Sequence, residues 1–567
     1  MRRVLIVGVV LCGVAFALGQ QPSPAIKLDQ VGYLSSAKKI AVVTSSAQTF
    51  EVKQVSDGKT VFKGTLSAAT KDADTGDTVQ SADFSKLRAS GSYYLDVLGV
   101  GRSWQFSIGP DVFARPYYLA MRSFYGQRCG TAVDLGSEFP GYKYPACHVK
   151  GAFHKSSGKE GDYEDAGGWH DAGDYGRYIP SSSVTVAVLM LAQDLYGDKT
   201  NKIALKIPES GNGTPDLLNE TRWNLEWMFK MQDTDGGVWQ KQTSTGFAGF
   251  IMPQDDKAAS EIIGTGSDPY KGTCATADLA AVGAMAARAY KPYDAAFAAK
   301  SLDVARKAWK WALAHPNETF TKNPTGVSTG MYPDPQCGDE ILWAAAELWH
   351  TTGEIDFDRY FADNYSKFTD KMQAPPPENW AEMSPFAAWG YLLSGRKGDA
   401  KAASEVRGIV VKAANDIVER TRTNGYHTSM IAKDYVWGSN SVAAQYGVQL
   451  LITNKIAPNP AYVEIAAENL HYLLGRNAFS TSWVTQVGDN PFRHPHHRPS
   501  QADANPEPWP GLVSGGPNAR WHNAELKIHE NTPPAKHWAD NWEAYAANEV
   551  AINWQGVLVF LLAGQLK

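Results

Sequence analysis

The sequence predicts a mainly α-helical protein with a small all-β domain in front of it. Between about residues 25 and 108, short runs that alternate apolar and polar residues are separated by turn signals, such as the Ser-Asp-Gly sequence at residues 56–58. This pattern is typical of a small antiparallel sandwich. After a junction at residues 109–110 (Gly-Pro), the apolar residues follow a helical period. Strands and helices do not alternate, so a parallel-sheet fold is disfavoured.

The individual elements follow from the same patterns. Four strands are expected, at Lys39–Val43, Phe50–Val55, Ser92–Val97 and Ser103–Ile108. About twelve helices are expected, at Val112–Tyr125, Ser181–Tyr196, Thr214–Met231, Thr273–Tyr290, Tyr293–Ala314, Asp339–Thr352, Phe357–Met372, Ser384–Ser394, Ala400–Arg422, Ser439–Thr453, Tyr462–Leu474 and Val550–Ala563. The third helix takes Thr214 as its N-cap and Pro215 as its first residue, a position that suits proline.

The N-terminus reads as a secretory signal peptide. Two arginines precede an apolar run from Val4 to Leu18, and small residues at Ala17 and Gly19 fit a cleavage site. The run is too short for a membrane span, and no later segment has 18 consecutive apolar residues. We therefore expect a soluble protein without a membrane partner after cleavage, secreted to the periplasm or the medium.

Composition narrows the possible partners. The chain has 54 Lys and Arg against 59 Asp and Glu, without a basic block, so nucleic acid is not an expected partner. Its 18 Trp and 25 Tyr fit a long groove for a stacked ligand, although large cores also use these residues.

The cysteines allow either disulfides or a metal site. Cys12 leaves with the signal peptide, and two disulfides are possible among the four that remain: Cys129, Cys147, Cys274 and Cys337. However, His148 directly follows Cys147. Together with Cys129 and His170, they offer two thiolates and two imidazoles, a set that suits tetrahedral zinc. A Cys129–Cys147 disulfide is the alternative.

The stretch GGWHDAGDYGRY (167–178) carries the clearest chemical signal. Asp171 and Asp174 stand three residues apart among glycines, with Trp169, Tyr175 and Tyr178 nearby. Because glycine disfavours a helix interior, we expect a loop that aims both acids into a cleft. Paired acids beside aromatic rings suit carbohydrate chemistry, in which rings stack on sugars and acids move protons. A solvated Asp-Gly turn is the alternative.

Three separated motifs extend this signal into a family resemblance. They are WHDAGDYGRY (169–178), SWVTQVGDNPFRHPHHR (482–498) and WADNWEAYAANEVAINW (538–554), with smaller agreements at MQDTDGGVWQK (231–241), YVWGSNS (435–441) and DQVGY (29–33). On these motifs the chain resembles family 9 of the glycoside hydrolases, the cellulase family. The resemblance implies an (α/α)6-barrel catalytic domain at 110–567, an immunoglobulin-like β-sandwich domain at 20–109 and a signal peptide at 1–19. Gln555 and Gly556 depart from the family pattern, which leaves the packing behind the acid open.

The resemblance also implies catalytic roles. Asp174 resembles the general base, Asp171 its helper in holding the attacking water, and Glu549 the general acid. An inverting glycosidase needs an acid and a base on opposite sides of the bond, roughly 6.5–9.5 Å apart. We expect Glu549 to open the last helix, where the dipole favours its ionised form, so burial or the nearby aspartates must keep it protonated. An ordinary first-turn glutamate is the alternative reading.

Four further residues are expected in the substrate cleft. His496 and Arg498 resemble a family pair that donates hydrogen bonds to sugar hydroxyls near the cleavage point. Trp437 is a candidate stacking platform or, alternatively, a core residue, and Tyr545 lies one helical turn before the acid.

Two other readings of this region concern metals. The long loop at 486–536 contains three histidines within four residues, His494, His496 and His497. Instead of binding sugar, this loop could therefore be a surface His-Pro loop or a metal site. The Cys, Cys-His, His set resembles a structural zinc site found in some family members, and such a site fixes the loop that carries Asp171.

Calcium is the second metal expected. Asp339 and Glu340 resemble carboxylates of a family calcium site, and Glu209, Asn212 and Asp216 form a second oxygen-rich loop. Helix N-capping is the alternative for each set.

Taken together, the sequence predicts a secreted, monomeric, inverting endo-β-1,4-glucanase acting on cellulose or related β-glucans. An exo-acting glucosidase, cellobiohydrolase or exo-glucosaminidase of the same fold is the alternative. A non-catalytic glycan-binding protein is disfavoured because all three carboxylates are present.

Overall fold

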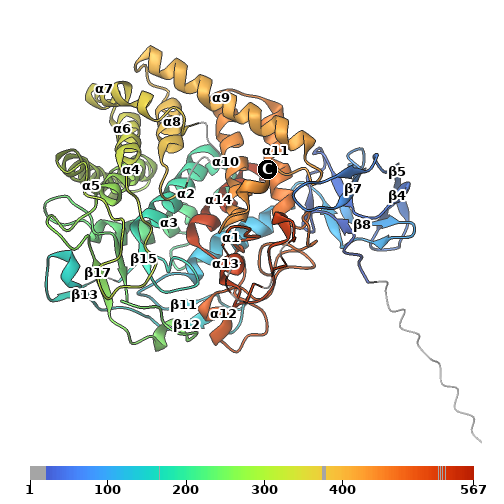
Figure 1. Ribbon diagram of the computed structural model, residues 1–567, viewed down its shortest axis with the longest axis horizontal. Helices are drawn as coiled ribbons and strands as arrows, with labels where there is room; N and C mark the ends of the chain where they lie inside the picture. Colours follow the sequence, from blue (N-terminus) through green and yellow to red (C-terminus); the bar gives the residue numbers. More distant parts are fainter. Residues whose placement is uncertain are drawn as a thin grey trace, which may run out of the picture.

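A computed structural model describes residues 21–567 apart from 165, 373–378, 522, 524, 527 and 530. Figure 1 shows a large helical body with a small β domain on one side. The predicted signal peptide lies outside the described residues.

The β domain is built from two sheets. One has the order β1 (Ile26–Lys27), β3 (Ile40–Val43), β7 (Thr78–Asp83), β6 (Thr70–Lys71). The other has the order β2 (Gly32–Tyr33), β10 (Phe106–Ile108), β8 (Gly91–Val97), β4 (Thr49–Gln54), β5 (Thr60–Thr65), with β9 (Gly101–Arg102) paired to β8. Side chains from both sheets form one apolar core, and the rings of Tyr33, Phe84 and Phe106 meet within it. The four predicted strands are confirmed, and the sequence reading missed the others.

Buried and partly buried polar contacts join the β domain to the helical body. The Oδ2 atom of Asp29 lies 2.7 Å from Nδ1 of His471, and both side chains are buried. Asp77 accepts a hydrogen bond from Tyr426 at 2.7 Å and pairs with Lys536 at 2.6 Å. The β domain is thus held against the helical body by specific polar contacts.

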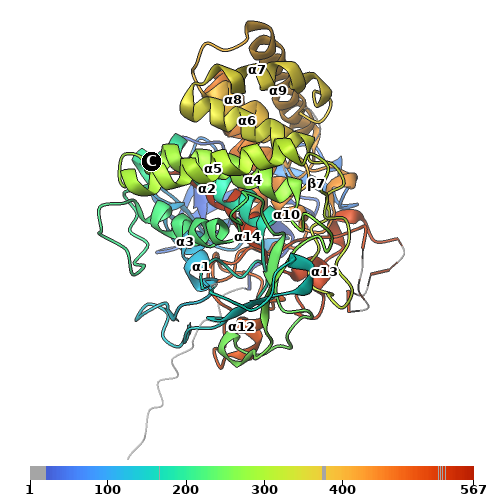
Figure 2. The ribbon, with the colours of Figure 1, turned by 90° about the vertical axis from the view of Figure 1, so that its left-hand side faces the viewer.

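The helical body is a ring of six inner helices inside six outer ones. The inner helices are α2 (Ile179–Thr200), α4 (Thr273–Tyr290), α6 (Gly338–Thr352), α8 (Ser384–Leu393), α10 (Ser439–Ile456) and α14 (Ile552–Gln565), and each packs against the next until α14 meets α2. The outer helices are α1 (Ala114–Gly126), α3 (Asp216–Lys230), α5 (Ala295–Ala314), α7 (Ile355–Asn364), α9 (Ala400–Thr423) and α11 (Pro460–Leu473). Figure 2 shows α5 alongside α4. The predicted (α/α)6 barrel is confirmed.

The inner helices α2 and α10 are buried nearly all round, whereas the outer helix α9 has an apolar face and a solvated face. Although the inner helices are strongly buried, no helix in the described part of the chain combines the length and the apolar character needed to cross a bilayer.

The twelve predicted helices are all present, with shifted ends. Helix α3 begins at Asp216 with Pro215 as its N-cap, and not at Thr214. Helix α7 ends at Asn364, well before Met372, and a short 3₁₀ turn follows it. Two short helices were not predicted, α12 (Arg498–Ala502) and α13 (Tyr545–Asn548).

The expectation that the chain remains helical after residue 110 is wrong in one region. A five-stranded sheet has the order β14 (Asp162–Tyr163), β13 (Gly151–Phe153), β17 (Ser260–Ile263), β16 (Lys241–Thr243), β15 (Arg177–Tyr178), and β11 (Val133–Asp134) pairs with β12 (Lys143–Tyr144). These strands have two to four residues each, too few to show an alternating period. They matter because β15 joins the acidic loop directly to α2.

One disulfide forms within the barrel. Cys274 in the first turn of α4 is bonded to Cys337, the N-cap of α6. Cys129 and Cys147 are free thiols, so the alternative disulfide between them is absent from the structure.

Replacing Cys274 and Cys337 together by alanine is expected to lower the free energy of unfolding by about 2–4 kcal/mol, because the bond closes a long loop in the unfolded chain. Thermal unfolding followed by circular dichroism measures this loss. Tris(2-carboxyethyl)phosphine should lower the Tm of the wild type but not that of the double variant. Equal melting of the two proteins without reductant would contradict a stabilising role.

Candidate active site

The acidic loop at 171–176 is held by neighbours that are distant in sequence. The backbone N–H of Asp171 donates to the carbonyl of Gly176 at 2.9 Å, and the N–H of Ile552 donates to the Asp171 carbonyl at 2.8 Å. A Cβ atom at Gly173 would lie 2.0 Å from the carbonyl oxygen of His496, so only glycine allows this approach. The acids therefore sit on a fixed, buried loop, and the alternative of a solvated turn is excluded.

Both carboxylate oxygens of Asp171 are occupied. The Ser181 hydroxyl donates to Oδ1, and the Tyr332 hydroxyl donates to Oδ2 at 2.5 Å. Burial and, to a smaller extent, the charge of Asp174 raise the pKa of Asp171 to about 7, although the two hydroxyl donors lower it. Asp171 is thus held in place by two hydroxyl donors, and burial and the charge of Asp174 both disfavour its ionised form.

Asp174 is held on one side only. Its Oδ2 accepts hydrogen bonds from the Tyr178 hydroxyl at 3.0 Å and from the N–H of Gly176 at 3.2 Å. Its Oδ1 has no hydrogen-bond partner among the described residues, and the side chain lines the cleft. This leaves one carboxylate oxygen of Asp174 able to accept a proton from a molecule in the cleft.

Glu549 reaches the same cleft from the other end of the chain. It does not open the last helix as expected. It follows α13 in an extended conformation, three residues before α14 begins, and forms a β-bridge with His496. The dipole of α14 therefore does not act on it at the first turn. Burial, followed by the charges of Asp174 and Asp171, raises the pKa of Glu549 to about 8, although Arg498 and a hydrogen bond from Trp437 lower it.

The three acids line one cleft of about 690 Å³. Its other lining residues include four of the predicted substrate-binding residues and several more aromatic ones: His496, Arg498, Trp437, Tyr545, Tyr178, Tyr332, Phe247, Trp380 and Trp554. An apolar cleft with a few convergent polar groups is the usual form of a ligand site.

His496 presents an acceptor to the cleft instead of the donor that we expected. Its Nδ1 lies 2.7 Å from the carbonyl oxygen of Trp542, so this nitrogen carries the proton. Burial lowers the pKa of His496 to about 4, which leaves the ring neutral and Nε2 unprotonated. Arg498 is the donor of the pair, with Nε and Nη1 on the carbonyls of Ala248 and Gly173.

The three histidines of this loop do not form a metal site. His494 is exposed, and the imidazole of His497 contacts Gln127 at 2.9 Å and Ser500 at 2.8 Å. The side chain of His496 is fixed by Trp542 as described above.

Trp437 lies at the surface of the cleft with 40 % of its side chain exposed, which excludes the alternative of a core residue. Trp521 stacks on it, with ring centroids 5.0 Å apart and an interplanar angle of 13°. Tyr545 contacts both indoles and the ring of His496. These rings form a rigid aromatic wall beside Glu549.

The side chain of Gln555, which departs from the family pattern, shows how the chain packs behind Glu549. Its side-chain oxygen accepts from the N–H of Val513 at 3.0 Å, and its nitrogen donates to the carbonyls of Ala120 and Gly511 at 3.1 and 2.8 Å. Glutamine therefore satisfies three buried backbone groups at this position.

Sequence reasoning missed several residues of the site. Tyr332, Trp380 and Phe247 line the cleft from long loops without a local motif. Tyr178 was noted only as an aromatic neighbour, although the motif that contains it was the available signal for its hydrogen bond to Asp174.

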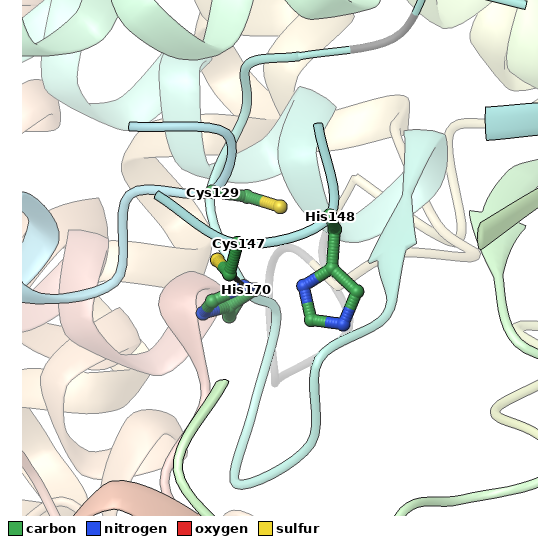
Figure 3. Close-up of side chains that lie close together, drawn as sticks. All are labelled: Cys129, Cys147, His148 and His170. Carbon is green, nitrogen blue, oxygen red and sulfur yellow. Dashed lines mark hydrogen bonds between the residues drawn. The ribbon is translucent and has the colours of Figure 1, made fainter. Parts of the chain in front are cut away.

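The predicted zinc ligands come together. Figure 3 shows Cys129, Cys147, His148 and His170 close together on three segments, and their ligand atoms all lie within 4.8 Å of one another. The Nδ1 atoms of both histidines are buried without a hydrogen-bond partner, and Nε2 of His148 is held 3.2 Å from Asp256. A carboxylate on the far nitrogen is the usual arrangement for a metal-bound histidine, so these residues fit zinc.

Of the predicted calcium ligands, one set fits and the other does not. Glu340 is fully buried with both oxygens unpartnered, next to Asp339 and the buried carboxylates of Asp278 and Asp334. Such a group of hard oxygen atoms fits calcium.

The second set has protein partners in place of a cation. Glu209 pairs with Arg128 at 2.9 Å, and Asp216 accepts from the backbone N–H of Leu205 at 2.8 Å. The amide of Asn212 pairs with the side chain of Asn219. These contacts take up the oxygen atoms that the prediction assigned to calcium at Glu209, Asn212 and Asp216.

A barrel of paired helices whose aromatic cleft holds two buried aspartates and a partly buried glutamate is the arrangement expected of a glycoside hydrolase. Residues 113–562 match the family description "Glycosyl hydrolase family 9", and residues 21–102 match "Cellulase N-terminal ig-like domain". The chain belongs to glycosyl hydrolase family 9.

Named relatives agree with this membership. Endoglucanase D of Acetivibrio thermocellus is 35 % identical over 95 % of this chain and 83 % of its own, and a cellodextrinase of Butyrivibrio fibrisolvens is 34 % identical over 96 % and 100 %. Among solved structures, a Bacteroides ovatus family 9 protein has a TM-score of 0.87 at 30 % identity, covering 96 % of this chain and 99 % of its own. A zinc-binding triple mutant of the family 9 endoglucanase J30 has a TM-score of 0.87 at 33 % identity, covering 94 % and 99 %.

Replacing Glu549 by glutamine is expected to stabilise the fold. The folded-state pKa of about 8 exceeds the unfolded value, so the wild type loses stability as pH rises from about 4.5 to about 8, while glutamine does not titrate. The gain should be absent at pH 4 and reach on the order of 1–3 kcal/mol at pH 8.

Thermal unfolding of both proteins at several pH values measures this difference. The matched control is Glu543→Gln, an exposed glutamate of the same segment, which should leave the Tm unchanged. A wild type as stable as Glu549→Gln at pH 8 would show that Glu549 is not held in an unfavourable charged environment.

Proposed function

We propose that the protein is a secreted endo-β-1,4-glucanase that hydrolyses cellulose or a related β-glucan with inversion at the anomeric carbon. The observation that carries the proposal is the single cleft that holds Asp171, Asp174 and Glu549 beside an aromatic wall. Family membership and the endoglucanase relatives support the activity and the substrate class.

In this proposal Asp174 accepts a proton, and Glu549, from a distant part of the chain, donates one. Asp174 takes a proton from water through its free Oδ1, while Asp171 helps to hold that water. Glu549 is protonated at neutral pH because of its raised pKa, and it gives its proton to the leaving sugar oxygen. The water attacks the face of the sugar opposite the leaving group, which inverts the configuration.

The remaining lining residues bind the sugar chain. The guanidinium of Arg498 donates to sugar hydroxyls, and Nε2 of His496 accepts from them. Trp437 and Tyr545 provide apolar surfaces for sugar rings beside the acid. Arg498 and His496 thus act as the donor and the acceptor that their hydrogen bonds to the protein backbone allow.

Both metals are proposed as structural. Cys129, Cys147, His148 and His170 would hold zinc, which cross-links three segments and fixes the loop that begins at Asp171. Asp339 and Glu340 would hold calcium beside the disulfide, at the start of α6.

The remaining proposals concern processing and architecture. We propose that residues 1–19 are a signal peptide, that the immunoglobulin-like domain occupies 20–109 and the catalytic domain 110–567, and that the mature protein acts as a secreted monomer.

Product analysis tests the reaction. Proton NMR of a fresh β-glucan digest should show the α-anomer first, because cleavage of a β-linkage with inversion yields that product. Asp174→Asn and Glu549→Gln should each lower kcat by about 10²–10⁴-fold, since each removes one proton transfer. Wild-type activity should fall as pH rises through about 8, where Glu549 loses its proton.

The matched control is Asp162→Asn, an exposed aspartate on β14, which should retain full activity. First appearance of the β-anomer would overturn inversion, and binding without turnover that Asp174→Asn leaves unchanged would favour a glycan-binding protein. Release of short sugars alone from a long polymer would favour an exo-acting enzyme, a candidate supported by the cellodextrinase relative.

Elemental analysis of two variants tests the two metal sites, and each variant serves as the control for the other. Cys147→Ser should lose zinc and keep calcium, whereas Glu340→Gln should lose calcium and keep zinc, because each removes one ligand of one site only. Both losses should lower the Tm. Wild-type protein without zinc after purification in zinc-containing buffer would refute the zinc site, and an unchanged calcium content in Glu340→Gln would refute the calcium site.

A further inference from the structure

Asn553 differs from the other residues that line the cleft, because its side chain keeps a buried polar atom without a hydrogen-bond partner. The residue is 9 % exposed, and no group in the described part of the chain donates to its Oδ1. Its Nδ2 likewise has no acceptor among the described residues. Nearly all buried polar groups of folded proteins are hydrogen-bonded, so an exception inside a ligand cleft requires an explanation.

The helix that carries Asn553 does not explain it. Asparagine is favoured at the N-cap of a helix and disfavoured in its interior. Asn553 is the second residue of α14, and the N-cap position belongs to Ala551, which forms no side-chain cap. The side chain of Asn553 therefore neither caps the helix nor improves its stability.

Gln555, two residues later, shows what the protein does with a buried amide that has only a structural role. Its oxygen and nitrogen are hydrogen-bonded to backbone groups of three other segments, as described above. The amide of Asn553 receives no such partners from the described chain. An unpaired buried polar group costs free energy, and a ligand that pairs with it recovers that cost on binding.

The position of Asn553 indicates which part of a ligand it meets. The N–H of Ile552 donates to the carbonyl of Asp171 at 2.8 Å, which holds the first turn of α14 against the acidic loop. Glu549 precedes Asn553 by four residues, and both line the same cleft. Asn553 thus lies between the segment of the acid and the loop of the base, where the sugar at the cleaved bond must sit.

The chemistry of a carboxamide suits a sugar hydroxyl. The group is neutral and offers both acceptor lone pairs and two N–H donors, and a hydroxyl also donates and accepts. A half turn about the last side-chain bond exchanges the oxygen and the nitrogen, and that torsion is two-fold, so either atom can be turned to the ligand. A negatively charged sugar is disfavoured because the cleft already holds three carboxyl groups.

We propose that Asn553 is a substrate-binding residue whose carboxamide hydrogen-bonds to a hydroxyl group of the sugar beside the cleaved bond. Its unpaired state in the free protein is the stability cost of keeping this contact for the substrate. The inference rests on the β-glucan hydrolysis proposed above.

The test is Asn553→Leu, which keeps a similar shape and removes the amide. A residue that serves the substrate and not the fold should give opposite changes in activity and stability. We expect kcat/KM on cellotetraose to fall about 10- to 100-fold, because a sugar hydroxyl loses its partner. We expect the Tm of the free protein to rise by about 1–3 °C, because an unpaired buried polar group is removed.

The matched control for stability is Gln555→Met, which removes the paired amide of the same helical turn. Its Tm should fall, because three buried backbone groups lose their partner. A fall in the Tm of Asn553→Leu, in parallel with Gln555→Met, would assign Asn553 a structural role and overturn the proposal. Wild-type kcat/KM in Asn553→Leu would overturn it as well.

Cellotetraose analogues that each lack one hydroxyl identify the contact directly. For one analogue, kcat/KM of the wild type and of Asn553→Leu should agree within about twofold, whereas the difference persists for the others. A difference that persists for every analogue rejects a direct contact. If Asn553→Leu does not fold, Asn553→Ala is measured on the same series with the same criterion.

Failure of the proposed function gives a different result. A wild-type protein that does not hydrolyse cellotetraose or longer β-glucans refutes the proposed reaction itself. Hydrolysis by the wild type, together with an equally active Asn553→Leu, refutes only the role of Asn553.

Discussion

The active site depends on the close approach of three backbone segments that are far apart in the chain. The loop at 171–176 contacts the carbonyl of His496 through Gly173, and the N–H of Ile552 binds the carbonyl of Asp171. The bridge between His496 and Glu549 completes the contact. Backbone hydrogen bonds fix these segments more firmly than side chains could, so the carboxylates have little freedom to move apart.

The barrel explains why these segments meet. The acidic loop leads through β15 into α2, and the segment that carries Glu549 leads into α14. Helices α2 and α14 close the inner ring by packing on each other, which brings both helix starts to the same end of the barrel. The disulfide and the acidic cluster also lie at helix starts, between α4 and α6. Ring closure thus places the functional groups at one end.

Placing three carboxylates together in a largely buried cleft has an electrostatic cost, and the site uses the pKa shifts that result. Desolvation and mutual repulsion raise the pKa of Asp171 to about 7 and that of Glu549 to about 8. The positive charge of Arg498 partly offsets the rise in the pKa of Glu549. The result is an uneven distribution of protons among similar side chains, which is the condition for one acid and one base to work in the same cleft.

The sequence by itself determined the fold class, the twelve long helices, the paired acids and the cysteine and histidine set, because helical periodicity and contiguous motifs are local properties. The tertiary structure decided the rest. It placed Glu549 before α14 instead of in its first turn, made His496 an acceptor through Trp542, and occupied Glu209 with Arg128. It also brought Tyr332 to Asp171 from a segment without an interpretable motif. Hydrogen-bond partners and burial depend on which distant atoms meet, and local sequence patterns do not contain that information.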